Sequence, residues 1–139
     1  MKSARSNSKS SFQFRLDLHS GVPVYRQLID QVRAGIAAGN LSVGDQLPTV
    51  RQLAVDLAIN PNTVLRAYRE LELGGLLETQ QGTGTFITQQ RPRLDEVERQ
   101  RQLSQLVGEF LARAGQAGFT AEELFKELRE LVQEQAPRR

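Results

Sequence analysis

The stretch LPTVRQLAVDLAINPNTVLRAYREL, residues 47–71, predicts two short amphipathic helices joined by a tight turn. Thr49 and Gln52 have the spacing of a capping box, in which the hydroxyl covers the backbone N–H three residues on and the glutamine reaches back. A helix should therefore begin after Thr49 and bury one apolar stripe, formed by Val50, Leu53, Ala54 and Leu57. Asn60 and Pro61 predict the next helix, because Asn is a strong N-cap and Pro is favoured in the first turn.

The second of these helices is expected to have a polar face opposite its apolar stripe. If Val64, Tyr68 and Leu71 face inward, helical geometry places five residues on the opposite side, namely Asn62, Leu65, Arg66, Arg69 and Leu73. Arginine can contact guanine with two hydrogen bonds, and asparagine can contact adenine likewise. Thr63 lies in the first turn, where a hydroxyl and a backbone N–H can hold a phosphate. The alternative is that Arg66 only forms a surface ion pair with Glu70.

Three further elements surround this helix pair. Alternating apolar residues predict a half-buried strand, with Phe12, Phe14, Leu16 and Leu18 on one face. Pro23 opens a first helix, whose stripe is Val24, Leu28, Ile29, Val32 and Ile36. Residues 76–79 and 85–88 are short strand candidates, and Gly82-Thr83-Gly84 supplies a hairpin turn between them. Helix, helix, helix and hairpin match the winged helix-turn-helix plan, in which the third helix enters the major groove and Arg51 would meet the DNA backbone.

The tail, residues 91–139, is rich in Glu, Gln, Arg and Leu and predicts two amphipathic helices, interrupted at residues 115–119. A capping box at Thr120 and Glu123 marks the second start. Such a hairpin buries its stripe poorly alone, so a second copy would complete a bundle, through Leu103, Leu106, Val107, Phe110, Leu124, Leu128 and Leu131. The alternative is that the stripes fold onto the same chain. An effector could bind between bundle helices, near Phe110, Phe119 and Phe125, although such aromatic residues more often belong to a core.

Composition narrows the function classes. The net charge is only +2, so bulk charge does not indicate DNA binding and the placement of charges must carry the argument. The chain has no cysteine and one histidine, His19, which predicts no metal site, no cofactor, no catalytic residues and no enzyme activity. We find no signal peptide or membrane span and expect a cytoplasmic protein. Residues 1–11 are expected to form a flexible basic arm that could contact phosphates.

With these residues placed, the chain resembles GntR-family regulators, specifically the YtrA branch, over roughly residues 12–135. The resemblance is carried by Pro23-Val-Tyr-Arg-Gln27, Leu47-Pro-Thr-Val-Arg-Gln-Leu-Ala54, Asn60-Pro-Asn-Thr-Val64, Arg66-Ala-Tyr-Arg-Glu-Leu71, Gly75-Leu-Leu77 and Gly82-Thr-Gly-Thr-Phe86. It implies DNA contacts at Arg51, Asn62, Thr63, Arg66, Arg69, Gly82 and Gly84. It also implies a homodimer, a palindromic double-stranded operator and, usually, repression. We expect Thr83, between the two glycines, to contact DNA as well.

The sequence departs from the family pattern in two places. Wings in the family often carry Lys or Arg, whereas Gln80, Gln81 and Thr83 are uncharged, which predicts a weak wing–phosphate contribution. Leu65 lies on the outward face, where polar residues are common, and could contact a thymine methyl group instead.

We therefore expect a mainly α protein with a small β-hairpin (α+β). Residues 12–90 should form a winged helix-turn-helix DNA-binding domain, and residues 91–139 a helical dimerisation region. The expected function is sequence-specific transcriptional regulation by a homodimer, with possible small-molecule control. The alternative is an architectural or protein-interaction module that binds DNA non-specifically, which salt-sensitive binding without operator preference would favour.

Overall fold

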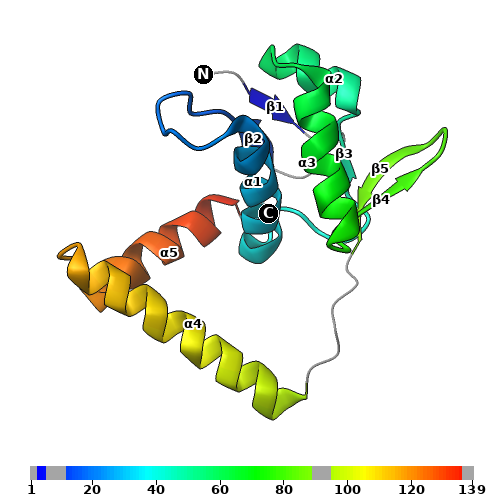
Figure 1. The fold of residues 1–139 in the computed structure, drawn as a ribbon. Coiled ribbons are helices and arrows are strands. Elements are labelled where there is room, and N and C mark those ends of the chain that lie inside the picture. Colours follow the sequence, from blue (N-terminus) through cyan, green and yellow to red (C-terminus); the bar gives the residue numbers. More distant parts are fainter. Residues whose placement is uncertain (1–2, 6–11, 89–94, 136–139) are drawn as a thin grey trace. The chain divides into compact units, whose positions relative to one another are not determined.

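The computed structural model describes residues 3–5, 12–88 and 95–135, with side chains for residues 12–88 and 95–132, and the chain forms two compact units (Figure 1). The first unit contains β1 (Ser3–Arg5), β2 (Gln13–Arg15), α1 (Val24–Ala38), β3 (Gln46–Leu47), α2 (Val50–Leu57), α3 (Pro61–Leu73), β4 (Leu77–Gln80) and β5 (Gly84–Ile87). The second unit ends at residue 134 and contains α4 (Glu96–Gln116) and nearly all of α5 (Ala121–Gln135). The predicted mainly α class with a small β region is confirmed.

The core of the first unit is formed by α1, α2 and α3 together with residues from β2, β4 and β5. The predicted inward stripes of α2 and α3 are buried, except that Val50 is only partly covered. In α1 the centre of the stripe is buried, and its two ends, Val24 and Ile36, are half-buried. The largest fully buried side chains of this unit include Phe14, Leu28, Ile29, Leu47, Leu53, Leu57 and Leu71. Close packing of this kind fixes the three helices relative to one another.

The N-terminal strand is shorter than its alternating pattern predicts. Phe12, Phe14 and Leu16 are buried as expected, but β2 ends at Arg15 and Leu18 is 76% exposed. Two glutamines of α1 explain the difference, because their side-chain amides bond the backbone at the end of β2 and just after it. Gln31 pairs with the N–H and the carbonyl of Arg15, and Gln27 pairs with those of Asp17.

Residues 1–11, the predicted arm, lie outside the described residues except for β1. The backbone of β1 pairs antiparallel with β2, with Ala4 opposite Phe14. This pairing could not be predicted, because residues 3–5 carry no apolar alternation.

A three-stranded antiparallel sheet with the order β3-β5-β4 follows the helices. The predicted hairpin is confirmed, with Leu77 opposite Ile87 and Gln80 opposite Gly84. Each strand lies one residue from its predicted bounds, so Gly84 is the first residue of β5 and not part of the turn. The third strand, β3, was not predicted, since two residues are too few to show a pattern.

The second unit consists of two consecutive helices joined by a short turn, and each helix has a formed N-cap. Within residues 95–132 the predicted packing of one helix along the other is not seen, because their apolar faces stay exposed. Asp95 accepts a hydrogen bond from the backbone N–H of Glu98 at the start of α4. The predicted capping box before α5 is complete, because Thr120 and Glu123 each bond the backbone N–H of the other. The predicted interruption begins two residues later than expected, since α4 continues to Gln116. Eleven large apolar side chains of this unit are between 42% and 81% exposed: Val97, Leu103, Leu106, Val107, Phe110, Leu111, Phe119, Phe125, Leu128, Leu131 and Val132.

Candidate nucleic-acid interface

A tight turn sets the direction of α3 relative to α2. Ala58 has φ 52° and ψ 51°, a left-handed conformation that is unusual for a residue with a Cβ. Its backbone N–H and that of Ile59 close the end of α2 on the carbonyl of Ala54. Asn60 then caps α3, as predicted, by accepting from the backbone N–H of Asn62 at 2.8 Å. The two helices therefore meet without an irregular linker.

Tyr68 ties α3 to the residues before α2. Its hydroxyl donates to the carbonyl oxygen of Pro48 at 2.7 Å, and both residues are buried. Burial raises the pKa of Tyr68 well above its usual value, because the phenolate would lose its hydration. This bond fixes the start of α2, and with it Arg51, relative to the outward face of α3.

The face of α3 opposite the core is exposed, as helical geometry predicts. Asn62, Arg66 and Arg69 all lie in solvent on this side, and Leu73 at its end is 89% exposed. Leu65 and Thr63 are half-buried at the edges of this face. We call the exposed set Asn62, Arg66 and Arg69 the polar face of α3. It offers donors and acceptors that suit the edges of bases in a major groove.

Arg66 has two neighbours on the protein. Its guanidinium carbon lies 3.7 Å from the centroid of the Tyr25 ring on α1. Its Nε lies 3.8 Å from a carboxylate oxygen of Glu70, one turn along α3. The ion pair is the alternative reading of Arg66 noted from the sequence, and it coexists with exposure of 60% of the arginine side chain. The Tyr25 contact was missed, because it joins residues 41 positions apart (66 − 25) that no local pattern connects.

Arg51 is exposed in the first turn of α2, where Thr49 caps the helix. The hydroxyl of Thr49 accepts from the backbone N–H of Gln52 at 3.1 Å, as predicted. The predicted return bond from Gln52 does not form, because its amide donates to the carboxylate of Asp56 at 2.7 Å instead. The capping box is therefore half-formed.

The hairpin turn is held from β3. The side-chain amide of Gln46 donates to the carbonyl oxygen of Thr83 at 3.2 Å. Gly82 has φ +80° and Gly84 has φ +141°, which L-residues with a Cβ rarely adopt. A Cβ on Gly84 would also stand 2.4 Å from Nε2 of Gln46. The backbone therefore favours glycine at both positions, in the turn at Gly82 and at the start of β5 at Gly84, before any ligand is considered.

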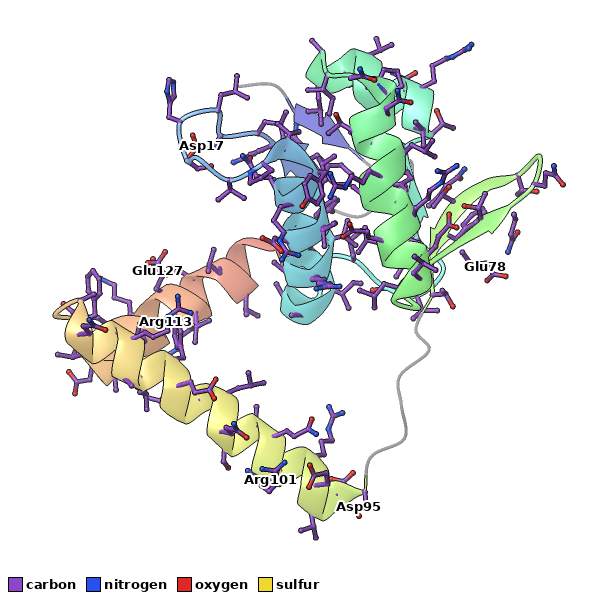
Figure 2. The ribbon with its side chains drawn as sticks, viewed as in Figure 1. Asp17, Glu78, Asp95, Arg101, Arg113 and Glu127 are labelled. Carbon is purple, nitrogen blue, oxygen red and sulfur yellow. The ribbon has the colours of Figure 1, made fainter. Side chains whose placement is uncertain are left out.

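The charge of the hairpin is not favourable to phosphates. Residues 77–87 contain no Lys or Arg, and Glu78 is exposed on β4, at the position labelled in Figure 2. The weak contribution of the wing to phosphate binding, expected from the same residues, stays a prediction. Among the described residues, no group of three His, Cys, Asp or Glu side chains could hold a metal ion. No helix within the same ranges has the length and apolar character needed to cross a bilayer.

Three packed helices followed by a hairpin, with a cationic face of the third helix exposed, define a winged helix-turn-helix protein. Residues 24–87 match the family of bacterial regulatory proteins called gntR. The chain is 36% identical over 107 residues to the HTH-type transcriptional regulator YhcF of Bacillus subtilis, covering 77% of this chain and 88% of that protein. The chain belongs to the GntR family of DNA-binding transcriptional regulators, and its relatives are regulators and not enzymes.

Similarity to YtrA proteins confirms the branch indicated by the sequence. The chain is 44% identical over 75 residues to the HTH-type transcriptional repressor YtrA of Bacillus subtilis, covering 54% of this chain and 58% of that protein. The structure of a YtrA from Sulfolobus acidocaldarius superposes with a TM-score of 0.54 at 31% identity, covering 71% of this chain and 97% of that one. A protein of Listeria monocytogenes described as a transcriptional antiterminator gives a TM-score of 0.61 at 29% identity, with 84% and 87% covered.

Proposed function

We propose that this regulator binds a palindromic operator as a homodimer and represses transcription. The observation that carries the proposal is the polar face of α3, which is exposed and lies opposite a closed core. In a winged helix-turn-helix this face enters the major groove. Repression is supported by the similarity to YtrA, a named repressor.

The polar face reads bases, and its neighbours position the protein on the backbone. Arg66 and Arg69 are placed to contact guanine edges, and Asn62 an adenine edge. Thr63 at the start of α3 and Arg51 at the start of α2 contact phosphates. At the wing, Gly82, Thr83 and Gly84 approach the duplex through their backbone, because the residues around them carry no positive charge.

The homodimer forms through α4 and α5. In our assignment residues 12–90 bind DNA and residues 91–139 dimerise. Leu103, Leu106, Val107 and Phe110 follow one stripe of α4, and each is at least 49% exposed. On α5, Leu128 and Leu131 are exposed, and Leu124 is half-buried. A contiguous apolar surface of this kind marks an interaction site, and a second copy would bury it in a helical bundle.

Control by a small molecule would depend on that bundle. Phe110, Phe119 and Phe125, near which an effector site was considered, are 49%, 57% and 64% exposed. They do not enclose a pocket by themselves. An effector site at these residues would be completed by the partner subunit and would couple ligand binding to the spacing of the two DNA-binding units.

The test begins with selection of bound fragments from genomic DNA, which yields the operator and its symmetry together. Half-sites should lie about one helical turn, roughly 10 base pairs, apart. Arg66→Ala should weaken operator binding by about 1–3 kcal/mol and relax the preference at one base pair of each half-site. Arg101→Ala, which removes an equally exposed arginine from α4, serves as the control and should leave that preference intact.

Two results would overturn the proposal. Footprints on single, unpaired half-sites would exclude the symmetric dimer. Equal affinity for operator and random fragments, together with a steep salt dependence, would instead support the alternative of a non-specific architectural module.

A further inference from the structure

The guanidinium of Arg66 lies over the ring of Tyr25. The ring centroid lies 3.7 Å from the guanidinium carbon, well within the range of a cation–π contact. The ring itself is half-buried and packs against the hydrophobic core. It is therefore held by the fold and does not depend on Arg66 for its position.

The contact leaves the arginine able to bind a second group. Stacking uses the flat face of the guanidinium, whereas hydrogen bonds to a guanine leave from its edge. The ion pair with Glu70 is made through Nε, at 3.8 Å, and not through the two terminal amino groups. Among the residues that the structure describes, these amino groups have no hydrogen-bond partner, and 60% of the side chain remains exposed.

The ring of Tyr25 restrains the conformation of the Arg66 side chain more than the carboxylate of Glu70 does. Glu70 is itself 43% exposed, and a surface ion pair at 3.8 Å is weak and screened by salt. An unrestrained arginine has many rotamers, and ordering them opposes binding. Because the Tyr25 ring packs against the core, its contact restricts the rotamers of Arg66 in the free protein and so lowers the entropy lost on DNA binding.

We propose that Tyr25 is a positioning residue that sets base discrimination by Arg66, by holding the guanidinium edge-outward for a base pair of the operator. This inference rests on the proposed function, since it requires that Arg66 reads a base. It assigns a specificity role to a residue of α1, outside the helix that enters the groove.

The test compares two substitutions in the full-length chain. Tyr25→Phe keeps the aromatic face, whereas Tyr25→Leu keeps apolar packing but removes the face. Each is titrated against the selected operator, against the operator changed at the base pair that Arg66 reads, and against random DNA. Tyr25→Leu should lower discrimination at that base pair by about two- to fivefold, with random-DNA affinity unchanged. Tyr25→Phe should retain most of the discrimination.

A double-mutant cycle shows whether the effect passes through Arg66. In an Arg66→Ala background, Tyr25→Leu should cause no further loss of discrimination. An equal loss in both backgrounds would overturn the inference. Thermal unfolding of each variant verifies the fold, and Tyr25→Met replaces Tyr25→Leu if the leucine variant does not fold.

Other outcomes identify other roles for the ring. Tighter operator binding by Tyr25→Leu would mean that the ring withholds Arg66 from DNA, which contradicts the proposal. Weaker binding of both variants to all sequences, with a shallower salt dependence, would mean a backbone contact by Tyr25 and would also contradict it. If the wild-type protein shows no preferred sequence, the proposed function itself fails. If it prefers an operator and Tyr25→Leu discriminates fully, only this inference fails.

Discussion

The two units of the chain place their apolar side chains in opposite ways. In residues 12–88, the stripes of three helices and the inward residues of the strands close over a common core. In residues 95–132, Ala114 is the one buried apolar residue, although the helices are longer and well capped. The same amphipathic pattern thus yields a complete core in one unit and an uncovered surface in the other.

This difference shows that an amphipathic pattern can predict where a helix forms without predicting how stable the helix is. A capped amphipathic helix forms its hydrogen bonds locally, but most of its stability comes from what its apolar face packs against. The first unit supplies that packing from its own sequence. In the proposed homodimer, the second unit obtains its packing from a second copy of the chain.

The largest effect is expected from a charge on the uncovered stripe. Phe110→Asp should dissociate the homodimer, because the carboxylate would be buried between helices without a partner. Operator affinity should fall about 10²–10⁴-fold, as the two half-sites would then be bound independently. Sedimentation velocity and DNA titration measure both effects. Gln105→Asp, on the opposite side of α4, is the matched control, and a dimeric Phe110→Asp protein would contradict the assignment.

Truncating one leucine in each unit tests whether that leucine packs in a core within one chain or in an interface between two chains. Leu53→Ala should lower the free energy of unfolding by about 2–5 kcal/mol at every protein concentration, because the cavity lies within one chain. The effect of Leu128→Ala should vary with concentration, because its packing belongs to an association equilibrium. Denaturant titrations at several concentrations distinguish the two. A concentration-independent loss for Leu128→Ala would show that its contacts lie within one protomer.

Removing the buried hydroxyl of Tyr68 tests how the first unit fixes its two DNA-binding helices. Tyr68→Phe should cost about 1–3 kcal/mol at neutral pH, because the carbonyl of buried Pro48 loses its donor. The raised pKa also predicts a pH dependence. Stability from the neutral phenol is present below pH 10 and is lost as pH rises through the higher folded-state value. The wild-type minus variant difference in unfolding free energy should therefore shrink in alkali, and a constant difference would argue against it.

The smallest effect is expected at the wing latch, the bond from Gln46 to Thr83. Gln46→Met keeps the volume of the side chain but removes the donor, so operator affinity should fall by at most about 1 kcal/mol. Dimerisation, which we assign to the other unit, should not change. DNA titration and sedimentation test both statements. A change in the oligomeric state of the Gln46→Met variant would contradict the assignment of dimerisation to the other unit.

Features that depend on near neighbours in sequence were predictable. The caps at Asn60 and Thr120 and the inward stripe of α3 follow from residue type and helical spacing, and the structure contains them. The hairpin was predicted for the same reason, with bounds shifted by one residue.

Features created by distant side chains were not predictable. Gln27 and Gln31 of α1 bond the backbone at the end of β2 and just after it, where the strand stops. The apolar alternation therefore overestimates the length of the strand, and Leu18 is exposed. The polar face of α3 was predicted as a set, but the stacking of Arg66 on Tyr25 depends on how α1 and α3 pack. Roles of these residues in DNA contact stay predictions.

The short strand β3 has one more consequence. It ends two residues before Thr49, the cap of α2, and it also carries the glutamine that restrains the tip of the hairpin. The hairpin tip is therefore coupled to the start of α2 through a single hydrogen bond. We expect a duplex whose groove geometry separates these two regions to bind less tightly, by at most about 1 kcal/mol, even where every contacted base is unchanged.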